Sequence, residues 1–131
     1  MKKAQSASEF LTITIAVVFF MTLFFVAVYN NIYERNKEKE DILVREIALS
    51  VQNEIDLAYQ SMDGYYREFR LSSNVYGKEY TQLSIEGTQD KYVVVSTSRS
   101  YASYEVKDVT ASGINPGVNV IRKENGVVLL N

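Results

Sequence analysis

The 131 residues of the sequence include no cysteine, no histidine and no tryptophan. Without cysteine there is no disulfide and no thiol redox pair, and without cysteine and histidine there is no zinc site of the common kind. Nucleophile systems built on Ser/His/Asp or Cys/His are excluded as well. We therefore expect a protein that is not an enzyme and holds no cofactor or metal. Two carboxylate pairs lack a third ligand and are expected on solvated surface, namely Glu105 with Asp108 and Glu86 with Asp90.

A strong charge of either sign is also missing. Fourteen basic residues against sixteen acidic ones give a formal net charge of −2. The basic residues are spread along the chain, so they form no stripe that would release counterions from a phosphate backbone. A nucleic-acid partner is therefore not expected.

Apolar residues are plentiful, and they are concentrated in a run of twenty uncharged residues from Phe10 to Tyr29. At about 1.5 Å per residue, a helix of this length covers about 30 Å, the thickness of the hydrocarbon core of a bilayer. The run is too long for the apolar region of a cleaved secretory signal, and no small-x-small cleavage site follows it. It is expected to stay in the protein and to span a membrane. Its paired phenylalanines would make the largest contacts: Phe19, Phe20, Phe24 and Phe25.

Glycine and proline are absent between Gln5 and Asp63, so no strong helix breaker occurs in this stretch. Beyond a highly charged segment, apolar residues recur at spacings of three and four, which predicts one apolar stripe on a helix. Its members are Val44, Ala48, Val51, Ile55, Ala58 and Met62, with Ile47 alongside. The stripe either packs on this chain's own carboxyl-terminal domain or, since its period also suits a coiled-coil seam, contacts helices of other copies.

Asp63-Gly64 predicts the end of the helix, because glycine adopts the left-handed conformation that follows many helix termini. Beyond it the apolar residues alternate with a period of two, which predicts about six short and mostly antiparallel strands. Asn125-Gly126 suits a two-residue hairpin turn. The expected strands lie within residues 65–71, 82–86, 91–99, 104–107, 118–123 and 127–130.

Together these segments predict an α+β fold, with a long amino-terminal α-helix and a small antiparallel β-sheet. The expected organisation has four parts. A short basic head occupies 1–4, and an apolar helix long enough to span a membrane occupies 5–29. A polar and amphipathic continuation of the helix occupies 30–63, and a small β-rich head domain occupies 64–131. A β domain of that size is marginally stable alone, so covering its sheet with the amphipathic helix would add the missing burial.

A short motif precedes the apolar run. Lys2-Lys3-Ala4 is followed by Gln5-x-x-x-Glu9 and then by Phe10-Leu11. The combination resembles the class III signal peptide of archaeal type IV pilins and archaellins. The resemblance is confined to the first fifth of the chain, and it implies a fold of the type IV pilin kind for the whole.

The resemblance also implies a maturation pathway and a function. A membrane-embedded prepilin peptidase would remove residues 1–4 as a leader peptide by cutting between Ala4 and Gln5, which leaves the apolar helix at the new amino terminus as the filament core. An assembly ATPase and a polytopic platform membrane protein would then build a helical homopolymer, with Gln5, Glu9, Phe10 and Leu11 at subunit contacts. The protein would be the structural subunit of a pilus at the cell surface, for adhesion or cell contact. The extracytoplasmic position of the head also rests on the resemblance, because Lys and Arg flank the run on both sides.

Glu9 has two compatible interpretations. A carboxylate at the edge of an apolar run needs a partner, and the α-amino group created by cleavage could neutralise Glu9 of a neighbouring subunit. Alternatively, Ser6 and Glu9 form a capping box at the start of the helix, where an acidic group also suits the helix dipole.

The second candidate function is a single-pass membrane protein that does not polymerise, or a minor pilus or archaellum subunit, which displays a small extracytoplasmic β domain. Seven of the ten tyrosines fall in the β-rich part. They either provide an adhesive surface or simply follow from the strand propensity of tyrosine.

Overall fold

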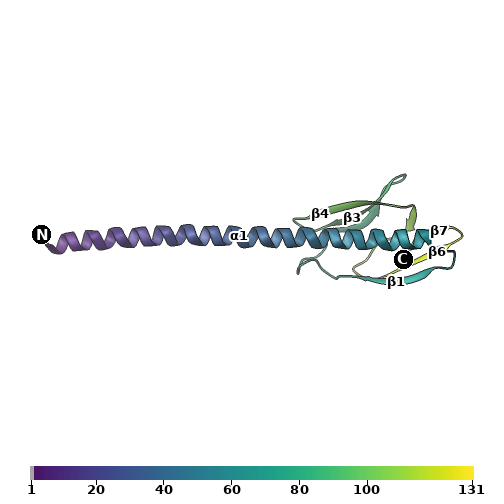
Figure 1. Cartoon of the computed structure of the whole chain (residues 1–131), viewed down its shortest axis with the longest axis horizontal. Helices are drawn as coiled ribbons and strands as arrows, with labels where there is room; N and C mark the ends of the chain where they lie inside the picture. Colours follow the sequence, from purple (N-terminus) through teal and green to yellow (C-terminus); the bar gives the residue numbers. More distant parts are fainter. Residues whose placement is uncertain (1) are drawn as a thin grey trace. The chain divides into compact units, whose positions relative to one another are not determined.

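The computed structural model describes the backbone of residues 2–131 and the side chains of residues 7–131. Over these residues the chain forms one helix, α1 (Lys2–Gln60), followed by seven strands (Figure 1). The α+β fold predicted from the sequence is confirmed. The chain divides into two compact units, Met1–Asn36 and Lys37–Asn131, and we call the second the head unit. The strands are β1 (Tyr66–Leu71), β2 (Gln82–Glu86), β3 (Lys91–Ser96), β4 (Tyr101–Val106), β5 (Val109–Ala111), β6 (Gly117–Glu124) and β7 (Val127–Leu130).

The carboxyl-terminal end of α1 is closed by groups from outside the helix. The Ser61 amide donates to the carbonyl oxygen of Leu57 at 3.1 Å, and Gly64 has a φ of 91°, which glycine adopts without strain. The last turn of α1 contains no basic residue. Instead the Lys123 ammonium of β6 donates to the carbonyl oxygens of Tyr59 at 2.6 Å and Ser61 at 2.8 Å. A cation at this position satisfies free carbonyls and complements the negative end of the helix dipole.

The apolar stripe of α1 is covered by the head unit's own strands. Its five members inside the helix have no exposed surface: Val44, Ala48, Val51, Ile55 and Ala58. The sequence left two possible partners for the stripe, and in the structure the chain's own β domain covers it. Met62, which was predicted to belong to the stripe, is 89% exposed, so that prediction is wrong. The helical spacing does not reach Met62 because α1 ends at Gln60.

The strands form two sheets. One has three antiparallel strands in the order β2-β3-β4, and the other has four strands in the order β1-β6-β7-β5. In the larger sheet β5 pairs in parallel with β7, whereas the other pairs are antiparallel. The predicted hairpin at Asn125-Gly126 is confirmed, because it joins β6 to β7 with positive φ at both residues. Strand β5 was not predicted, and it is only three residues long.

Both sheets contribute to one core around the helix. In Figure 1, β3 and β4 lie on one side of α1, and β1 of the larger sheet lies on the other. The buried residues Val93 and Val95 of β3 belong to the same cluster as Ile121 of β6 and Val128 of β7. The helical stripe is therefore the common centre of two sheets.

Candidate functional site

The apolar run from Phe10 to Tyr29, which we call the apolar segment, lies entirely within α1 and outside the head unit. Its large side chains are all exposed, from 38% at Val28 to 72% at Phe10. The phenylalanines that were predicted to make the largest contacts are 58%, 68%, 64% and 64% exposed at Phe19, Phe20, Phe24 and Phe25, and Leu11 is 60% exposed. The segment is apolar on all sides and has no polar face opposite an apolar stripe. Its whole circumference is therefore more stable in an apolar environment than in water.

The threonine hydroxyl groups of the apolar segment form hydrogen bonds within the helix and do not need water. Thr12 donates to the Ser8 carbonyl oxygen at 2.9 Å, Thr14 to that of Phe10 at 2.9 Å, and Thr22 to that of Val18 at 2.8 Å. These bonds run back along the helix by four residues, a common arrangement of threonine in apolar helices. Neither the backbone nor these hydroxyls oppose transfer of the segment into a nonpolar surrounding.

Length and composition make α1 the one helix among the described residues that is capable of crossing a membrane. A retained signal sequence meets the same criterion, so the finding establishes compatibility with membrane association. Tyr29 at the end of the segment is 70% exposed, and Tyr33 is 46% exposed. Exposed tyrosines suit the interface between hydrocarbon and water.

Glu9 immediately precedes the apolar segment, and its side chain is exposed. Within residues 7–131 no cation lies at ion-pair distance from its carboxylate. Because α1 begins at Lys2, Ser6 lies inside the helix in the whole chain and does not occupy the capping position that the capping-box interpretation required. The predicted cleavage site Ala4–Gln5 is in helical backbone, and its side chains lie outside the described residues.

The most buried charged group in the described chain is Glu40 of α1, whose exposed fraction is 1%. The Lys78 ammonium donates to its Oε2 at 2.9 Å, and the Thr97 hydroxyl donates to its Oε1. Thr97 Oγ1 in turn accepts from the Ser100 amide at 3.2 Å. Burial alone would raise the pKa of Glu40, but the hydrogen bonds from Thr97 and Lys78 and the charges of Lys78 and Arg99 outweigh it and lower the pKa.

Glu40 therefore joins three separate parts of the head unit. Lys78 lies between β1 and β2, and Thr97 lies in the turn between β3 and β4. This group was not predicted from the sequence, because Glu40 stands in a run of charged residues. A signal was present, since Glu40 precedes Val44 by four residues and so extends the apolar stripe by one turn.

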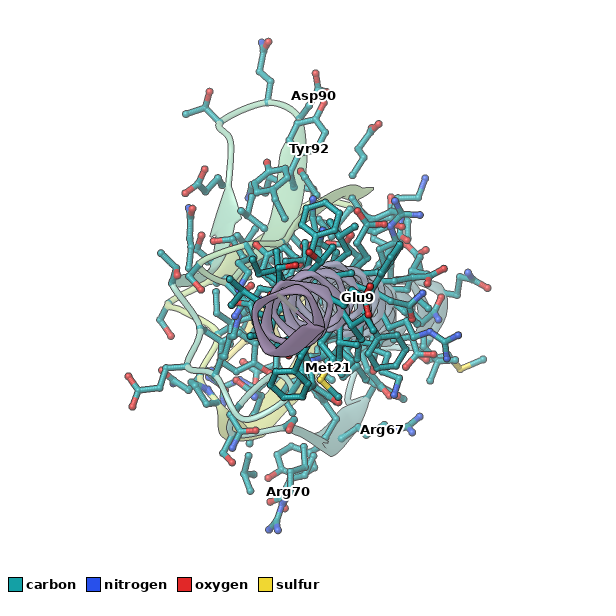
Figure 2. All side chains as sticks on the ribbon, turned by 90° about the vertical axis from the view of Figure 1, so that its left-hand side faces the viewer. Glu9, Met21, Arg67, Arg70, Asp90 and Tyr92 are labelled. Atoms are coloured by element: carbon teal, nitrogen blue, oxygen red, sulfur yellow. The ribbon has the colours of Figure 1, made fainter. Side chains whose placement is uncertain are left out.

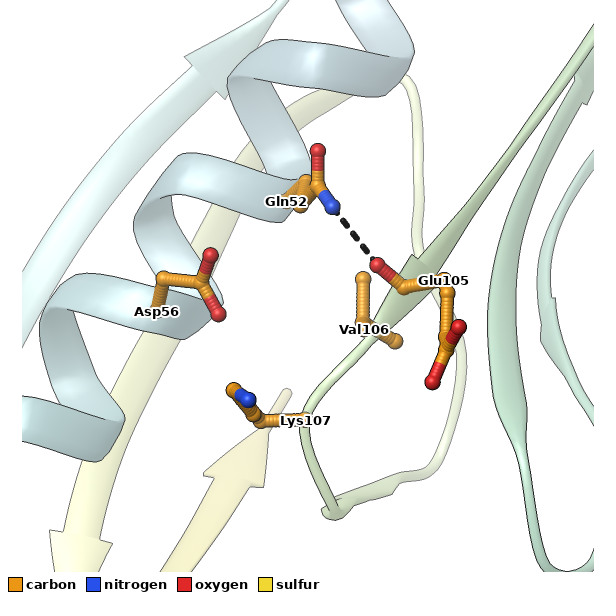
Figure 3. Close-up of a pocket in the computed structure, with 5 residues that line it drawn as sticks. All are labelled: Gln52, Asp56, Glu105, Val106 and Lys107. Carbon is orange, nitrogen blue, oxygen red and sulfur yellow. Dashed lines mark hydrogen bonds between the residues drawn. The ribbon is translucent and has the colours of Figure 1, made fainter.

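A polar pocket of about 300 Å³ lies between α1 and the end of β4 (Figure 3). It is lined by Gln52, Asp56, Glu105, Val106 and Lys107, and the Gln52 amide donates to the Glu105 carbonyl oxygen at 2.6 Å. The described residues contain no group of three or more acidic, histidine or cysteine side chains placed to hold a metal ion. Of the carboxylates considered from the sequence, Asp108 pairs with Lys91 at 2.8 Å, and Glu86 accepts from Gln82 on the same strand.

Comparison with known proteins does not assign the chain to a family. No family model, curated protein or solved structure matches it. The features that bear on function are the exposed apolar segment, Glu9 at its edge and the surface of the head unit.

Proposed function

We propose that the protein is a structural subunit of a type IV pilus-like surface filament, and that it polymerises through its apolar segment after prepilin peptidase has removed residues 1–4. One observation supports this most. The apolar segment has its whole circumference exposed in the single chain, while the head unit completes its core without it. Such a segment requires either lipid or other copies of itself, and a pilin uses both in succession.

The proposal gives Glu9 a role that the single chain leaves open. Its exposed carboxylate has no cation within reach among residues 7–131, yet it borders the apolar segment. In a bundle of apolar helices an isolated carboxylate would be costly, so a cation from a neighbouring subunit is needed. The α-amino group created at Gln5 by cleavage is the cation that the sequence offers.

The decisive first experiment is to determine the amino terminus of the protein isolated from membranes or from surface filaments. Cleavage predicts a mature chain that begins at Gln5, detected by mass spectrometry. A chain that still begins at Met1, in cells that contain the peptidase, contradicts the proposal. Electron microscopy of a strain with a tagged copy then tests whether the protein lies along the filaments.

The role of Glu9 is tested by Glu9→Gln. The amide keeps the size of the side chain and removes its charge, so filament abundance should fall by at least tenfold if a charge pair aligns the subunits. Glu34→Gln, an exposed position on the same helix, is the matched control and should assemble normally. Normal filament abundance with Glu9→Gln would contradict the pairing.

The second candidate, a single-pass membrane protein that displays the head unit without polymerising, rests on the same exposed segment, because a bilayer alone would cover it. The two proposals differ in what surrounds the segment in the final state. Filaments that contain the protein favour the first. A protein that is found only in the membrane fraction, as separate monomers, favours the second.

A further inference from the structure

One face of the three-stranded sheet carries an acidic and aromatic row. The register places Glu86 of β2 opposite Tyr92 of β3, and Tyr92 opposite Glu105 of β4. Side chains at directly opposed positions of adjacent strands project to the same face of a sheet. All three residues are exposed, with Tyr92 at 38%, and we call them the Glu-Tyr-Glu row.

The chemistry of the Glu-Tyr-Glu row suits a guanidinium group. An aromatic ring attracts a cation to its face, and a carboxylate on each side adds hydrogen-bond acceptors and negative charge. The row itself contains no cation, and Lys91 beside Tyr92 is engaged elsewhere, because its ammonium pairs with Asp108 at 2.8 Å. Glu86 Oε1 accepts hydrogen bonds from Gln82 and Ser84, but both donors are neutral, so the negative charge of the row remains available to a partner.

An exposed cation, Arg70, lies on the opposite side of the head unit (Figure 2). In Figure 2, Tyr92 lies toward the top of the head unit and Arg70 lies at its bottom edge. Arg70 belongs to β1, which is an edge strand of the four-stranded sheet. Its neighbour Arg67 pairs with Glu54 at 3.3 Å, whereas the exposed guanidinium of Arg70 makes no ion pair or hydrogen bond within residues 7–131.

We propose that Arg70 of one copy docks on the Glu-Tyr-Glu row of a second copy, so that head units associate head to tail. This inference rests on the proposed function and names the contact between head units within that assembly. The two surfaces are complementary in charge, and they lie on opposite sides of one unit, so each copy offers both at once. Contacts between two different surfaces repeat from copy to copy and build open arrays unless the rotation closes a ring.

Crosslinking tests the contact directly, because the chain has no cysteine of its own. The full-length double variant Glu68→Cys/Thr88→Cys places exposed thiols two residues from Arg70 and two residues from Glu86 and keeps both side chains of the contact. In membranes or filaments it is treated with a short bismaleimide. The expected product is a ladder of multimers, since every copy links to two others. Either single-cysteine variant can give at most dimers. A double variant that gives no multimers beyond dimers, in material that is assembled, overturns the contact.

Charge reversal tests the same contact without a crosslinker. Arg70→Glu in the full-length chain should weaken self-association in detergent micelles about tenfold, measured by sedimentation velocity at low ionic strength. Combining it with Glu86→Lys and Glu105→Lys should restore association, because the charges are then exchanged. Arg122→Glu is the control, since Arg122 is also exposed, lies opposite Tyr66 at the far end of the β1–β6 pair and forms an ion pair only with Glu124 of its own strand, at 3.5 Å. Equal effects of Arg70→Glu and Arg122→Glu overturn the proposal.

The outcomes separate this contact from the proposed function. Filaments that form while the cysteine pair gives no multimers overturn the docking of Arg70 and leave the pilin-like function supported. A multimer ladder from membranes in which the chain still begins at Met1 supports the docking and contradicts the pilin-like function.

Discussion

Two stretches of α1 differ in the exposure of their apolar side chains. Between Phe10 and Tyr29 the large apolar side chains are all exposed, whereas between Val44 and Ala58 the apolar stripe has no exposed surface. The first stretch is apolar around its whole circumference and the second along one side. The difference teaches that hydrophobicity alone does not bring a helix into a core. The periodicity of the apolar residues decides whether the chain's own strands can cover them or whether lipid or other copies must do so.

The sharpest test of this difference removes apolar volume from each kind of surface. Ile55→Ala empties a fully buried site and should cost about 3 kcal/mol of head-unit stability, because a cavity remains. This corresponds to a loss of about 15 °C in Tm for a domain of this size. The measurement is thermal unfolding of the full-length chain in detergent, followed by the near-ultraviolet circular dichroism of its tyrosines.

Leu57→Ala is the matched control, two residues along the same helix. Leu57 is 47% exposed, so the substitution should change the Tm by less than about 3 °C. Leu23→Ala in the apolar segment should leave the unfolding of the head unit unchanged. A loss of Tm for Leu23→Ala as large as that for Ile55→Ala would contradict the conclusion that the buried stripe, and not the apolar segment, stabilises the head unit.

The second test places a charge in the apolar segment. Phe20→Asp should weaken membrane insertion by about 3 kcal/mol, since a carboxylate at the centre of a bilayer is poorly solvated. The fraction of the full-length chain in the membrane pellet after alkaline extraction measures this loss, and Phe20→Leu should behave as the wild type. The Tm of the head unit should not change. Full retention of Phe20→Asp in the membrane would contradict the prediction that the apolar segment inserts into the bilayer.

The third test concerns the charged group at the end of the buried stripe. Lys78→Met leaves the carboxylate of Glu40 buried without its ammonium partner and should destabilise the head unit by about 2 kcal/mol. Glu38→Gln, at an exposed position on the same helix, is the control and should have little effect. A Tm for Lys78→Met equal to that of Glu38→Gln would show that the pair adds nothing to stability.

The same group predicts how stability depends on pH. The pKa of Glu40 is lowered from 4.5 in the folded chain, so the unfolded chain binds the proton more tightly. The stabilisation from the carboxylate is therefore complete above about pH 4.5 and is lost as the pH falls through the lowered pKa. Thermal unfolding between neutral and acidic pH should show a steeper loss in the wild type than in Glu40→Gln. Parallel curves would contradict this linkage.

The smallest expected effect is at the end of α1. Lys123→Met removes the ammonium that binds the Tyr59 and Ser61 carbonyl oxygens and should cost about 1 kcal/mol. Hydrogen exchange of the amides in the last turn of α1 should accelerate, and the Tm should fall by about 5 °C. Lys107→Met, at an exposed lysine beyond β4, serves as the control. Unchanged exchange in Lys123→Met would mean that the helix end is held by other contacts.

The local patterns of the sequence predicted much of the fold. The stripe from Val44 to Ala58 has a strict helical spacing, and Asn125-Gly126 specifies one kind of hairpin, so both predictions are confirmed. The prediction that Met62 belongs to the stripe was wrong, because the spacing of three and four residues continues in the sequence after α1 has ended. Strand β5 was missed because three residues show no reliable alternation, and its parallel pairing with β7 depends on tertiary context.

The candidate site was predicted less evenly. The apolar segment is readable from composition, since a long run without charge has few structural solutions. The partners of Glu40 could not be predicted, because Lys78 and Thr97 are distant in sequence and are brought together only by the loops between strands. The Glu-Tyr-Glu row requires the register of three strands, and alternation within each strand does not supply that register.

The cap on α1 has a consequence for the order of events during synthesis. Lys123 follows Tyr59 by 64 residues, so the helix emerges from the ribosome long before the group that closes its end. The larger sheet is delayed in the same way, because β1 pairs with β6. A nascent chain that stops short of β6 therefore has a helix with an open terminus and a stripe that the larger sheet does not yet cover. The head unit can therefore be complete only after nearly the whole chain has been synthesised.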